Sequence, residues 1–307
     1  MTLPWLIITT HTTRHLRRSL LGVSSESPRP RRVLVSCDVQ DESIRALVAA
    51  CSAELSLDIT LVDRPHQNQC RLSQVRNNGL RAAIQLGASD QDLFAFIDGD
   101  CSPAPDHAAR LAALPESISL VCAHRVELTP QQTESFDEAA VRDRRPPAAI
   151  RPEQLAALDK RQARSSRQAF LRRLGFSKGH KPKILGANFA VRLAIAKAVN
   201  GFDEAFIEWG AEDDDFSHRA YGAGARPHVG VHDIIVYHQH HPTRAPGKWA
   251  DAPGVARFNE PGPIYCKLGL FSPMDQPTPV VRIYAAGACT SESQLAIPAA
   301  PSSRSTV

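Results

Sequence analysis

Short apolar runs alternate with helix-like segments through the part of the chain that precedes Asp98. Four of these runs have the length and β-branched composition of buried strands, at residues 5–10, 33–37, 59–62 and 93–97. Three segments between them place apolar residues at helical spacing, at residues 15–23, 44–55 and 72–86, and Ser43 is the predicted N-cap of the second. This alternation predicts an α/β fold with a mixed, mostly parallel sheet flanked by helices.

The rest of the chain is less regular. Strands are predicted at residues 118–126, 184–191 and 229–237, and helices at residues 194–199 and 213–221. The polar, proline-containing residues 129–152 predict a loop or mobile insertion, and residues 152–174 predict a helix with a dense arginine and lysine face. From about residue 285 the chain is rich in Ala, Ser and Pro, which predicts a disordered tail.

The overall composition is that of a soluble globular protein, with 43% hydrophobic and 22% charged residues and a net charge of +4. So mild a charge gives no argument for a nucleic acid partner. Seven cysteines without C-x-x-C spacing favour free thiols in a reducing compartment, and the apolar N-terminus is too short for a secretion signal. We therefore expect a cytoplasmic protein.

Basic residues crowd into residues 142–183. A solvated helix face is the plainest interpretation of such a charge run. The functional alternatives are a site for an anionic acceptor and peripheral contact with the inner face of an acidic membrane.

Carboxylates stand at the ends of two predicted strands. Asp38 follows the second strand, and Asp98-Gly99-Asp100 follows the fourth. Ligands bind beyond the carboxyl ends of the strands in doubly wound sheets. Two carboxylates in such a turn can converge on one hard cation, and Mg²⁺ and Mn²⁺ prefer oxygen ligands. A D-x-D triplet is frequent by chance, and the apolar strand before this one is what favours a metal site.

The last predicted strand leads into His238-Gln239-His240-His241. Imidazole nitrogen suits Mn²⁺ better than Mg²⁺. If the strand continues, His238 and His240 point to one side of it and His241 to the other. A polar loop of surface histidines is the alternative, but the D-x-D at another strand end favours at least one metal ligand here.

The run Trp209-Gly210-Ala211-Glu212-Asp213-Asp214-Asp215 gathers four carboxylates at the start of a predicted helix. Their mutual repulsion is costly unless a cation, a proton or a substrate hydroxyl uses them. The positive end of the helix dipole helps to keep Asp213 ionised, so that it can act as a general base on a hydroxyl group. Simple N-capping, which requires one acidic residue, is the alternative.

Taken together, these segments resemble a family 2 glycosyltransferase of the GT-A (Rossmann-like) fold, over roughly residues 5–242. In the first half the likeness lies in residues 6–11, 33–38 and 76–80 and in the D-x-D. In the second half residues 186–190, 199–204 and 209–215 resemble the galactosyltransferase-type module of β-1,4-galactosyltransferases and bacterial chondroitin-type polymerases. Ala211 stands where the family more often has glycine, and residues 142–183 have no counterpart.

The resemblance implies a nucleotide-sugar donor, usually a UDP-sugar, with Mn²⁺ or Mg²⁺ on its diphosphate. Asp100 is then the main metal ligand, and Asp98 contacts the ribose or sugar and helps with the metal. His238, with His240 as second choice, completes the coordination. The further donor-binding residues are Thr9, His11, Asp38 and Arg76.

The resemblance also implies an inverting transfer. Asp213 takes a proton from an acceptor hydroxyl, and Glu212 positions the acceptor hydroxyls. Trp209 packs against a sugar face, and Asn188 belongs to the acceptor site. The acceptor is left open between a glycan, a lipid-linked compound and a small molecule.

The implied division of the chain has four parts. These are a nucleotide-sugar-binding half (1–126), a basic, partly helical insertion (127–183), an acceptor-binding and catalytic half (184–284) and the tail (285–307). A metal-dependent phosphoester hydrolase or nucleotidyltransferase is the alternative enzyme class, because it uses the same carboxylates with water or a nucleotide. A non-catalytic sugar- or nucleotide-binding relative is a third interpretation, weakened because every expected catalytic carboxylate is present.

Overall fold

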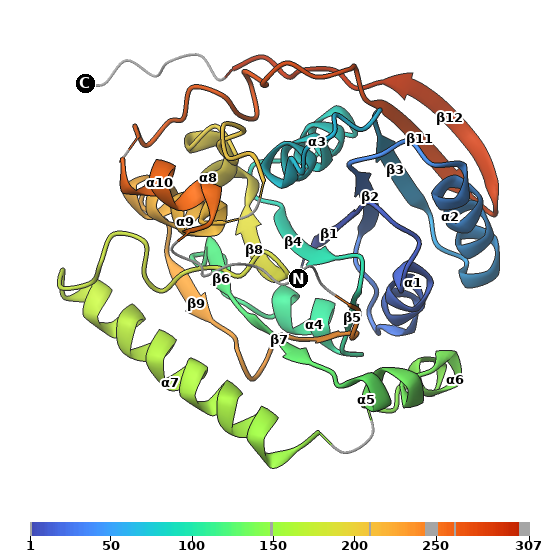
Figure 1. Ribbon diagram of the computed structural model, residues 1–307, viewed down its shortest axis with the longest axis horizontal. Coiled ribbons are helices and arrows are strands. Elements are labelled where there is room, and N and C mark those ends of the chain that lie inside the picture. The colour runs from blue at the N-terminus through green and yellow to red at the C-terminus, as the bar shows by residue number, and fades with distance from the viewer. Residues whose placement is uncertain (1, 148–149, 209, 243–250, 261, 301–307) are drawn as a thin grey trace.

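The computed structural model describes residues 2–147, 150–208, 210–242, 251–260 and 262–300. Two sheets and the helices around them make up this structure (Figure 1). The strands of the large sheet are, in spatial order, β12 (Ala288–Gln294), β11 (Val280–Ala285), β3 (Ile59–Asp63), β2 (Arg32–Cys37), β1 (Trp5–Thr10), β4 (Leu93–Asp98), β8 (Asn188–Arg192), β6 (Leu120–Cys122) and β9 (Pro227–Val229). Those of the small sheet are β5 (Cys101–Pro103), β10 (Ile235–His238) and β7 (His124–Glu127).

The centre of the large sheet is parallel. Strands β3, β2, β1 and β4 run in one direction, with Thr10 level with Cys37 and Thr9 level with Asp98. The flanking strands β8 and β11 pair antiparallel with β4 and β3. The predicted mixed sheet flanked by helices is therefore confirmed, and the carboxyl ends of β1, β2 and β4 meet at one edge.

Helices lie on both faces of the large sheet, and others pack outside these or against the small sheet. They are α1 (Leu16–Ser25), α2 (Glu42–Leu55), α3 (Leu72–Gln85), α4 (His107–Ala112), α5 (Pro130–Ser135), α6 (Glu138–Arg142), α7 (Pro152–Arg173), α8 (Leu193–Ala198), α9 (Glu212–Gly222) and α10 (Pro253–Asn259). Because side chains alternate along a strand, Leu6 and Ile8 of β1 pack with α1 and α2, whereas Trp5 and Ile7 pack with α3, α8 and α9. No helix among the described residues has both the length and the apolar composition that a bilayer crossing requires.

The strands and helices predicted before Asp98 all form, and one cap differs. Asp41, not Ser43, is the N-cap of α2, because the Asp41 carboxylate accepts a hydrogen bond from the Ser43 backbone N–H at 2.7 Å. Ser43 therefore lies inside the first turn of the helix. An aspartate and a serine are both good caps, so the sequence pattern alone does not separate them.

Three predictions for the second half of the chain were wrong in detail. The predicted strand at residues 118–126 is divided into β6 and β7, which belong to different sheets. The strand at residues 229–237 is likewise divided into β9 and β10. The predicted loop at residues 129–152 contains α5 and α6, whose N-caps are Thr129 and Asp137. Helices of one turn or so are too short to show a periodic apolar pattern.

The prediction of a disordered tail at residues 285–307 was also wrong for residues 288–294, and residues 301–307 lie outside the described residues. Strand β12 pairs antiparallel with β11, and β11 pairs with β3 at the edge of the large sheet. The side chains of β12 are exposed, so the strand needs no large apolar residues. Its place in the sheet comes from backbone hydrogen bonds, which composition does not reveal. Residues 280–294 thus extend the sheet on the side of the first half of the chain.

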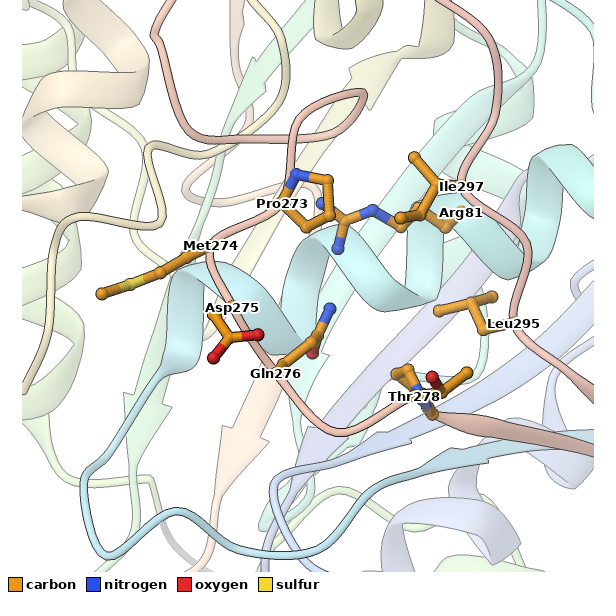
Figure 2. A pocket seen from close by; sticks show the side chains of 9 residues that line it. Arg81, Pro273, Met274, Asp275, Gln276, Thr278, Leu295 and Ile297 are labelled. Atoms are coloured by element: carbon orange, nitrogen blue, oxygen red, sulfur yellow. The ribbon is translucent and has the colours of Figure 1, made fainter.

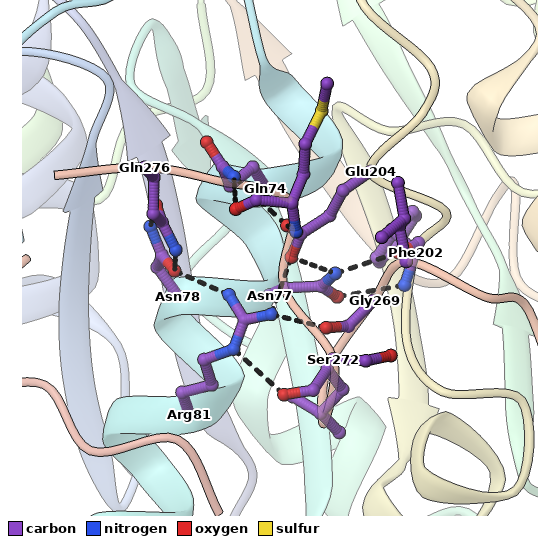
Figure 3. Close-up of polar contacts among 12 residues, drawn as sticks. Gln74, Asn77, Asn78, Arg81, Phe202, Glu204, Gly269, Ser272 and Gln276 are labelled. Carbon is purple, nitrogen blue, oxygen red and sulfur yellow. Dashed lines mark hydrogen bonds and ion pairs between the residues drawn. The ribbon is translucent and has the colours of Figure 1, made fainter. Parts of the chain in front are cut away.

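Helix α3 carries a buried polar face (Figure 3). Arg81 and Glu204 form an ion pair of 2.6 Å in which both side chains are fully buried. Asn77 donates to the Phe202 carbonyl at 2.8 Å and to Glu204 at 2.9 Å, and its oxygen accepts from the Phe202 backbone N–H. Gln74 also donates to Glu204, at 3.1 Å. Residues 202–204 of the second half are thereby fixed to a helix of the first half.

A cavity of about 320 Å³ lies between α3 and two further segments, one that leads into β11 and one that follows β12 (Figure 2). Its lining residues are Arg81, Pro273, Met274, Asp275, Gln276, Thr278, Pro279, Leu295 and Ile297. The Arg81 guanidinium also donates to the carbonyls of Leu270 and Gly269, so the buried cation here is already satisfied. The cavity contains no residue of the predicted site.

The substitution Arg81→Met tests the buried network. It leaves the Glu204 carboxylate buried without its cation, and we expect the free energy of unfolding to fall by about 3–5 kcal/mol. Arg110→Met is the matched control, because Arg110 pairs with Asp106 at 2.6 Å with both side chains about half exposed. That loss should be at most about 1 kcal/mol. Denaturant unfolding measures the free energy of unfolding of both variants. Equal losses would contradict a stabilising role of the buried Arg81–Glu204 pair.

Candidate active site

The D-x-D turn lies at the carboxyl edge of the parallel strands, between the two sheets. Strand β4 ends at Asp98, and β5 begins directly after Asp100. The Gly99 backbone N–H donates to the Thr9 carbonyl at 2.8 Å. A Cβ at position 99 would lie 2.7 Å from Thr10 Oγ1, so a glycine is required for this close approach. The turn is therefore packed tightly against β1.

The small sheet brings the histidines to the D-x-D turn. His238 ends β10, where it lies opposite Cys101 of β5 and Glu127 of β7. His238 Nε2 is 3.5 Å and His241 Nε2 2.9 Å from Asp100 Oδ2. One ligand atom from each of Asp100, His238 and His241 lies within 4.8 Å of the others. This cluster of one carboxylate and two imidazoles is the best candidate metal site among the described residues.

His240, predicted as the second choice of metal ligand, lies outside this cluster. Its backbone N–H donates to Thr133 Oγ1 at 2.7 Å, and its carbonyl lies 3.1 Å from the His15 ring. The strand ends at His238, so the alternation that would place His238 and His240 on one side does not continue. The chain turns instead and brings His241 next to Asp100.

Two residues of β7 complete the surroundings of the cluster. Glu127 Oε2 lies 2.6 Å from His238 Nδ1, and Glu127 Oε1 accepts from Arg125 Nε at 2.6 Å. Arg125 Nη1 lies 3.8 Å from Asp98 Oδ2. A carboxylate on the far nitrogen of a histidine fixes the ring and leaves the near nitrogen free to coordinate. Glu127 is in that position, and no local sequence pattern predicts it.

The charges of the cluster shift its pKa values. Burial disfavours the Asp100 carboxylate, but His238 and His241 outweigh burial and lower the pKa of Asp100 to about 2. Burial lowers the pKa of His238, whereas its contacts with Asp100 and Glu127 raise it to about 9 overall. Burial and the charge of Asp100 raise the pKa of Asp98. Asp100 is thus ionised near neutral pH, and any cation competes with the His238 proton.

Arg76 joins the acidic run to α3. Its guanidinium is buried, and Nη1 lies 3.1 Å from Asp213 Oδ1 and 3.5 Å from Glu212 Oε1. The ring of Phe202 lies under it, at 5.1 Å from the guanidinium carbon to the ring centroid. The Gly186 backbone N–H donates to Asp213 Oδ2 at 2.7 Å. Asp213 is therefore oriented from both sides, by a cation and by a backbone amide.

Every carboxylate of the acidic run has a basic partner, which two of them share. Glu212 and Asp213 share Arg76, and the Gly210 backbone N–H donates to Glu212 at 3.2 Å. Asp214 is buried against Lys183 at 2.7 Å and Lys181 at 3.4 Å. Asp215 pairs with Arg219 at 2.7 Å. The four acids therefore divide into a pair beside Arg76, an Asp214 that fixes α9 to residues 181–183, and an Asp215 that pairs within α9.

The same charges shift the pKa values of Glu212 and of Arg76 itself. Burial and the Asp213 charge raise the pKa of Glu212 to about 7, although Arg76 opposes both. Burial disfavours the Arg76 cation, but Asp213, Glu212 and Asp98 together raise its pKa. Asp98 thus interacts with the same guanidinium as Glu212 and Asp213. The D-x-D turn and the acidic run therefore belong to one electrostatic site.

The predicted donor residues differ in exposure and in the hydrogen bonds that their side chains already make within the protein. Thr9 Oγ1 donates to Asp98 Oδ1 at 3.1 Å, and His11 follows β1 with an exposed side chain. The Asp38 carboxylate accepts from Arg64 Nη2 at 2.5 Å and from the Arg71 backbone N–H at 3.2 Å. Asp38 is therefore already engaged with residues 64–71, and its contact with a donor stays a prediction.

The predicted acceptor residues differ in their burial and in the hydrogen bonds that they already make. Asn188 is buried, its amide donates to the carbonyls of His124 and Ile234, and its oxygen faces the His107 ring at 3.4 Å. This side chain ties β8 to the small sheet and has no group left for an acceptor. Glu212 is nearly buried and Asp213 is 17% exposed. Trp209 lies outside the described residues.

Comparison with known proteins supports the assignment of the second half. Residues 169–241 match the family model described as the N-terminal domain of galactosyltransferase. This segment begins in α7, contains α9 and ends at His241. It carries a glycosyltransferase module, and the predicted galactosyltransferase-type module is confirmed for it. The match spans less than half of the chain, and no curated protein matches the chain.

Solved structures resemble the chain more distantly. The crystal structure of GalNAc-T7 with UDP, GalNAc and Mn²⁺ is 14% identical with a TM-score of 0.49, over 77% of this chain and 44% of that chain. The chain thus spans less than half of that protein. The catalytic domain of Drosophila β1,4-galactosyltransferase 7 with xylobiose is 13% identical with a TM-score of 0.49, over 93% and 94% of the two chains.

The substitution Gly186→Ala tests the packing around Arg76. A Cβ at position 186 would overlap Arg76 Nη2 and lie 3.0 Å from Asp213 Oδ1. We expect it to displace both charged groups and to lower the free energy of unfolding by about 1–3 kcal/mol. Gly262→Ala is the matched control, because a Cβ there meets no atom within 4 Å, and its effect should stay within about 0.5 kcal/mol. Thermal unfolding of the two variants measures the difference.

Proposed function

We propose that the chain is a metal-dependent, inverting glycosyltransferase that moves a sugar from a UDP-sugar to an acceptor hydroxyl. The observation that carries the proposal is the position of Arg76, whose charge acts on Asp98 of the D-x-D turn and on Glu212 and Asp213 of the acidic run. A donor at the first group and an acceptor at the second would then meet. The galactosyltransferase family match of residues 169–241 supports the same activity.

The residues at the D-x-D turn fit a divalent cation. Asp100, His238 and His241 would hold it, and their ligand atoms already lie within 4.8 Å of one another. One carboxylate and two imidazoles suit Mn²⁺ better than Mg²⁺, which prefers oxygen ligands throughout. When bound, such a cation screens the negative charge of the leaving diphosphate. Glu127 keeps the His238 ring in the orientation that this binding needs.

Asp213 is the proposed general base. Arg76 and the Gly186 N–H fix its carboxylate, and part of the side chain remains accessible. A base fixed in this way takes the acceptor proton while the hydroxyl attacks the anomeric carbon from the side opposite the leaving group. Glu212, whose pKa is raised to about 7, carries a proton below that pH and can donate it in a hydrogen bond to an acceptor hydroxyl.

A UDP-release screen tests the function. Purified protein is incubated with a panel of nucleotide-sugars, with Mn²⁺ and with Mg²⁺, in the presence and absence of sugar acceptors. A transferase releases more UDP when an acceptor is present, and mass spectrometry detects the glycosylated acceptor. UDP-sugar cleavage that no acceptor stimulates, or cleavage of nucleotide esters without any sugar, would favour the hydrolase alternative.

The substitution Asp213→Asn tests the base. It removes the proton acceptor and keeps the shape of the side chain, so we expect kcat to fall by about 10²–10⁴-fold. Binding of UDP with Mn²⁺, measured by calorimetry, should change little. Asp215→Asn is the control from the same acidic run, because Asp215 pairs with Arg219 away from Arg76. If Asp213→Asn retains full activity, another group is the base.

Two neighbouring histidines test the metal site. His241→Ala removes a side chain 2.9 Å from Asp100, and we expect Mn²⁺ affinity to fall at least about tenfold. His240→Ala is the matched control, because its contacts with Thr133 and His15 are made by the backbone. Calorimetric titration with Mn²⁺ measures both variants and Asp100→Ala, which should also weaken binding. If His240→Ala weakened Mn²⁺ binding and His241→Ala did not, His240 would be the ligand.

A further inference from the structure

The outer face of α7 and the turn that follows it carry exposed basic and apolar side chains. Residues 160–183 contain no Asp or Glu. Lys160, Arg164 and Arg167 are exposed, and their spacing of four and three residues places them in one row along the helix. Leu174 continues the row, and it is 52% exposed. The row thus runs from basic to apolar along the helix.

Exposed aromatic side chains lie at the apolar end of this row. Phe170 is 60% and Phe176 79% exposed, whereas phenylalanine side chains are mostly buried in folded proteins. Arg172 stacks on Tyr221 in the last turn of α9, with the guanidinium 3.7 Å from the ring centroid. This contact fixes the end of α7 to the protein body. The two phenylalanines therefore project from an anchored position.

The opposite face of α7 packs against the protein around Leu158. Leu158 is buried, and α7 packs against β7 and β9. Gln162 accepts a hydrogen bond from the Val231 backbone N–H at 3.0 Å, and Asp159 pairs with His232 at 3.1 Å. The helix lies at the periphery of the molecule with its outer face away from both sheets (Figure 1). Its orientation is thus set by the fold, and the basic row is what it presents outward.

We infer that this face, defined by Lys160, Arg164, Arg167, Phe170, Leu174 and Phe176, docks on an anionic lipid surface. Basic side chains along the helix attract the headgroups, and the apolar side chains at its end enter the boundary between headgroups and acyl chains. A second copy of the chain fits less well, because a two-fold contact would bring the basic rows together without an acid to pair them. An anionic glycan would pair with the arginines and stack on the phenylalanines, but it would leave Leu174 without an apolar partner.

Vesicle sedimentation tests the inference without any need for activity. Purified protein is mixed with vesicles of phosphatidylcholine alone or of phosphatidylcholine with phosphatidylglycerol. We expect the protein to sediment with the second kind only, and salt to weaken the binding. Sedimentation with neither kind, or equally with both, would overturn the inference.

Matched variants locate the surface. Arg167→Gln should weaken binding to the anionic vesicles about fivefold, whereas Arg32→Gln, which removes an exposed charge from the start of β2, should change it less than about twofold. Phe170→Ser with Phe176→Ser should weaken binding at least about tenfold. Equal effects of the two arginine variants would overturn the inference. So would a dimer in size-exclusion chromatography that the phenylalanine variant converts to a monomer. Unchanged thermal unfolding shows that the variants remain folded.

Discussion

The buried guanidinium of Arg76 is the interaction on which the rest of the site depends. A cation in a protein interior is costly by several kcal/mol unless carboxylates compensate it closely. Glu212 and Asp213 do so from α9, and the Phe202 ring covers the guanidinium. The arrangement fixes a helix of the first half of the chain to the acidic run of the second. It also keeps negative charge concentrated at the point where the two halves meet.

Some residues of the segments that resemble the glycosyltransferase family hold the two halves of the chain together rather than bind a ligand. Asn77 holds the backbone of Phe202 through both ends of its amide, and Glu204 is shared by Arg81 and Gln74. Asn188, which we expected at the acceptor, ties β8 to the small sheet. A motif therefore combines residues that do chemistry with residues that position them. The structure separates the two kinds by showing which polar groups are already satisfied.

The sequence predicted what local pattern can reveal. Strand composition and helical spacing located the parallel centre of the sheet, and the D-x-D turn followed from its place at a strand end. The pairing of β7 with β10 brings Glu127 to His238, and no local pattern reports a contact across so many residues. The choice between His240 and His241 depends on where β10 ends, which is the least certain property of a predicted strand. Strand β12 has no apolar face to detect.

A double-mutant cycle between Arg76 and Asp213 tests the central claim most directly. The free energy of unfolding is measured for the protein, for Arg76→Met, for Asp213→Asn and for the double variant. If the buried guanidinium joins the two halves, the two changes are coupled by about 1–3 kcal/mol, because the second costs little once the first has broken the pair. If the loss in the double variant equals the sum of the two single losses within about 0.5 kcal/mol, the pair does not connect the two halves of the chain.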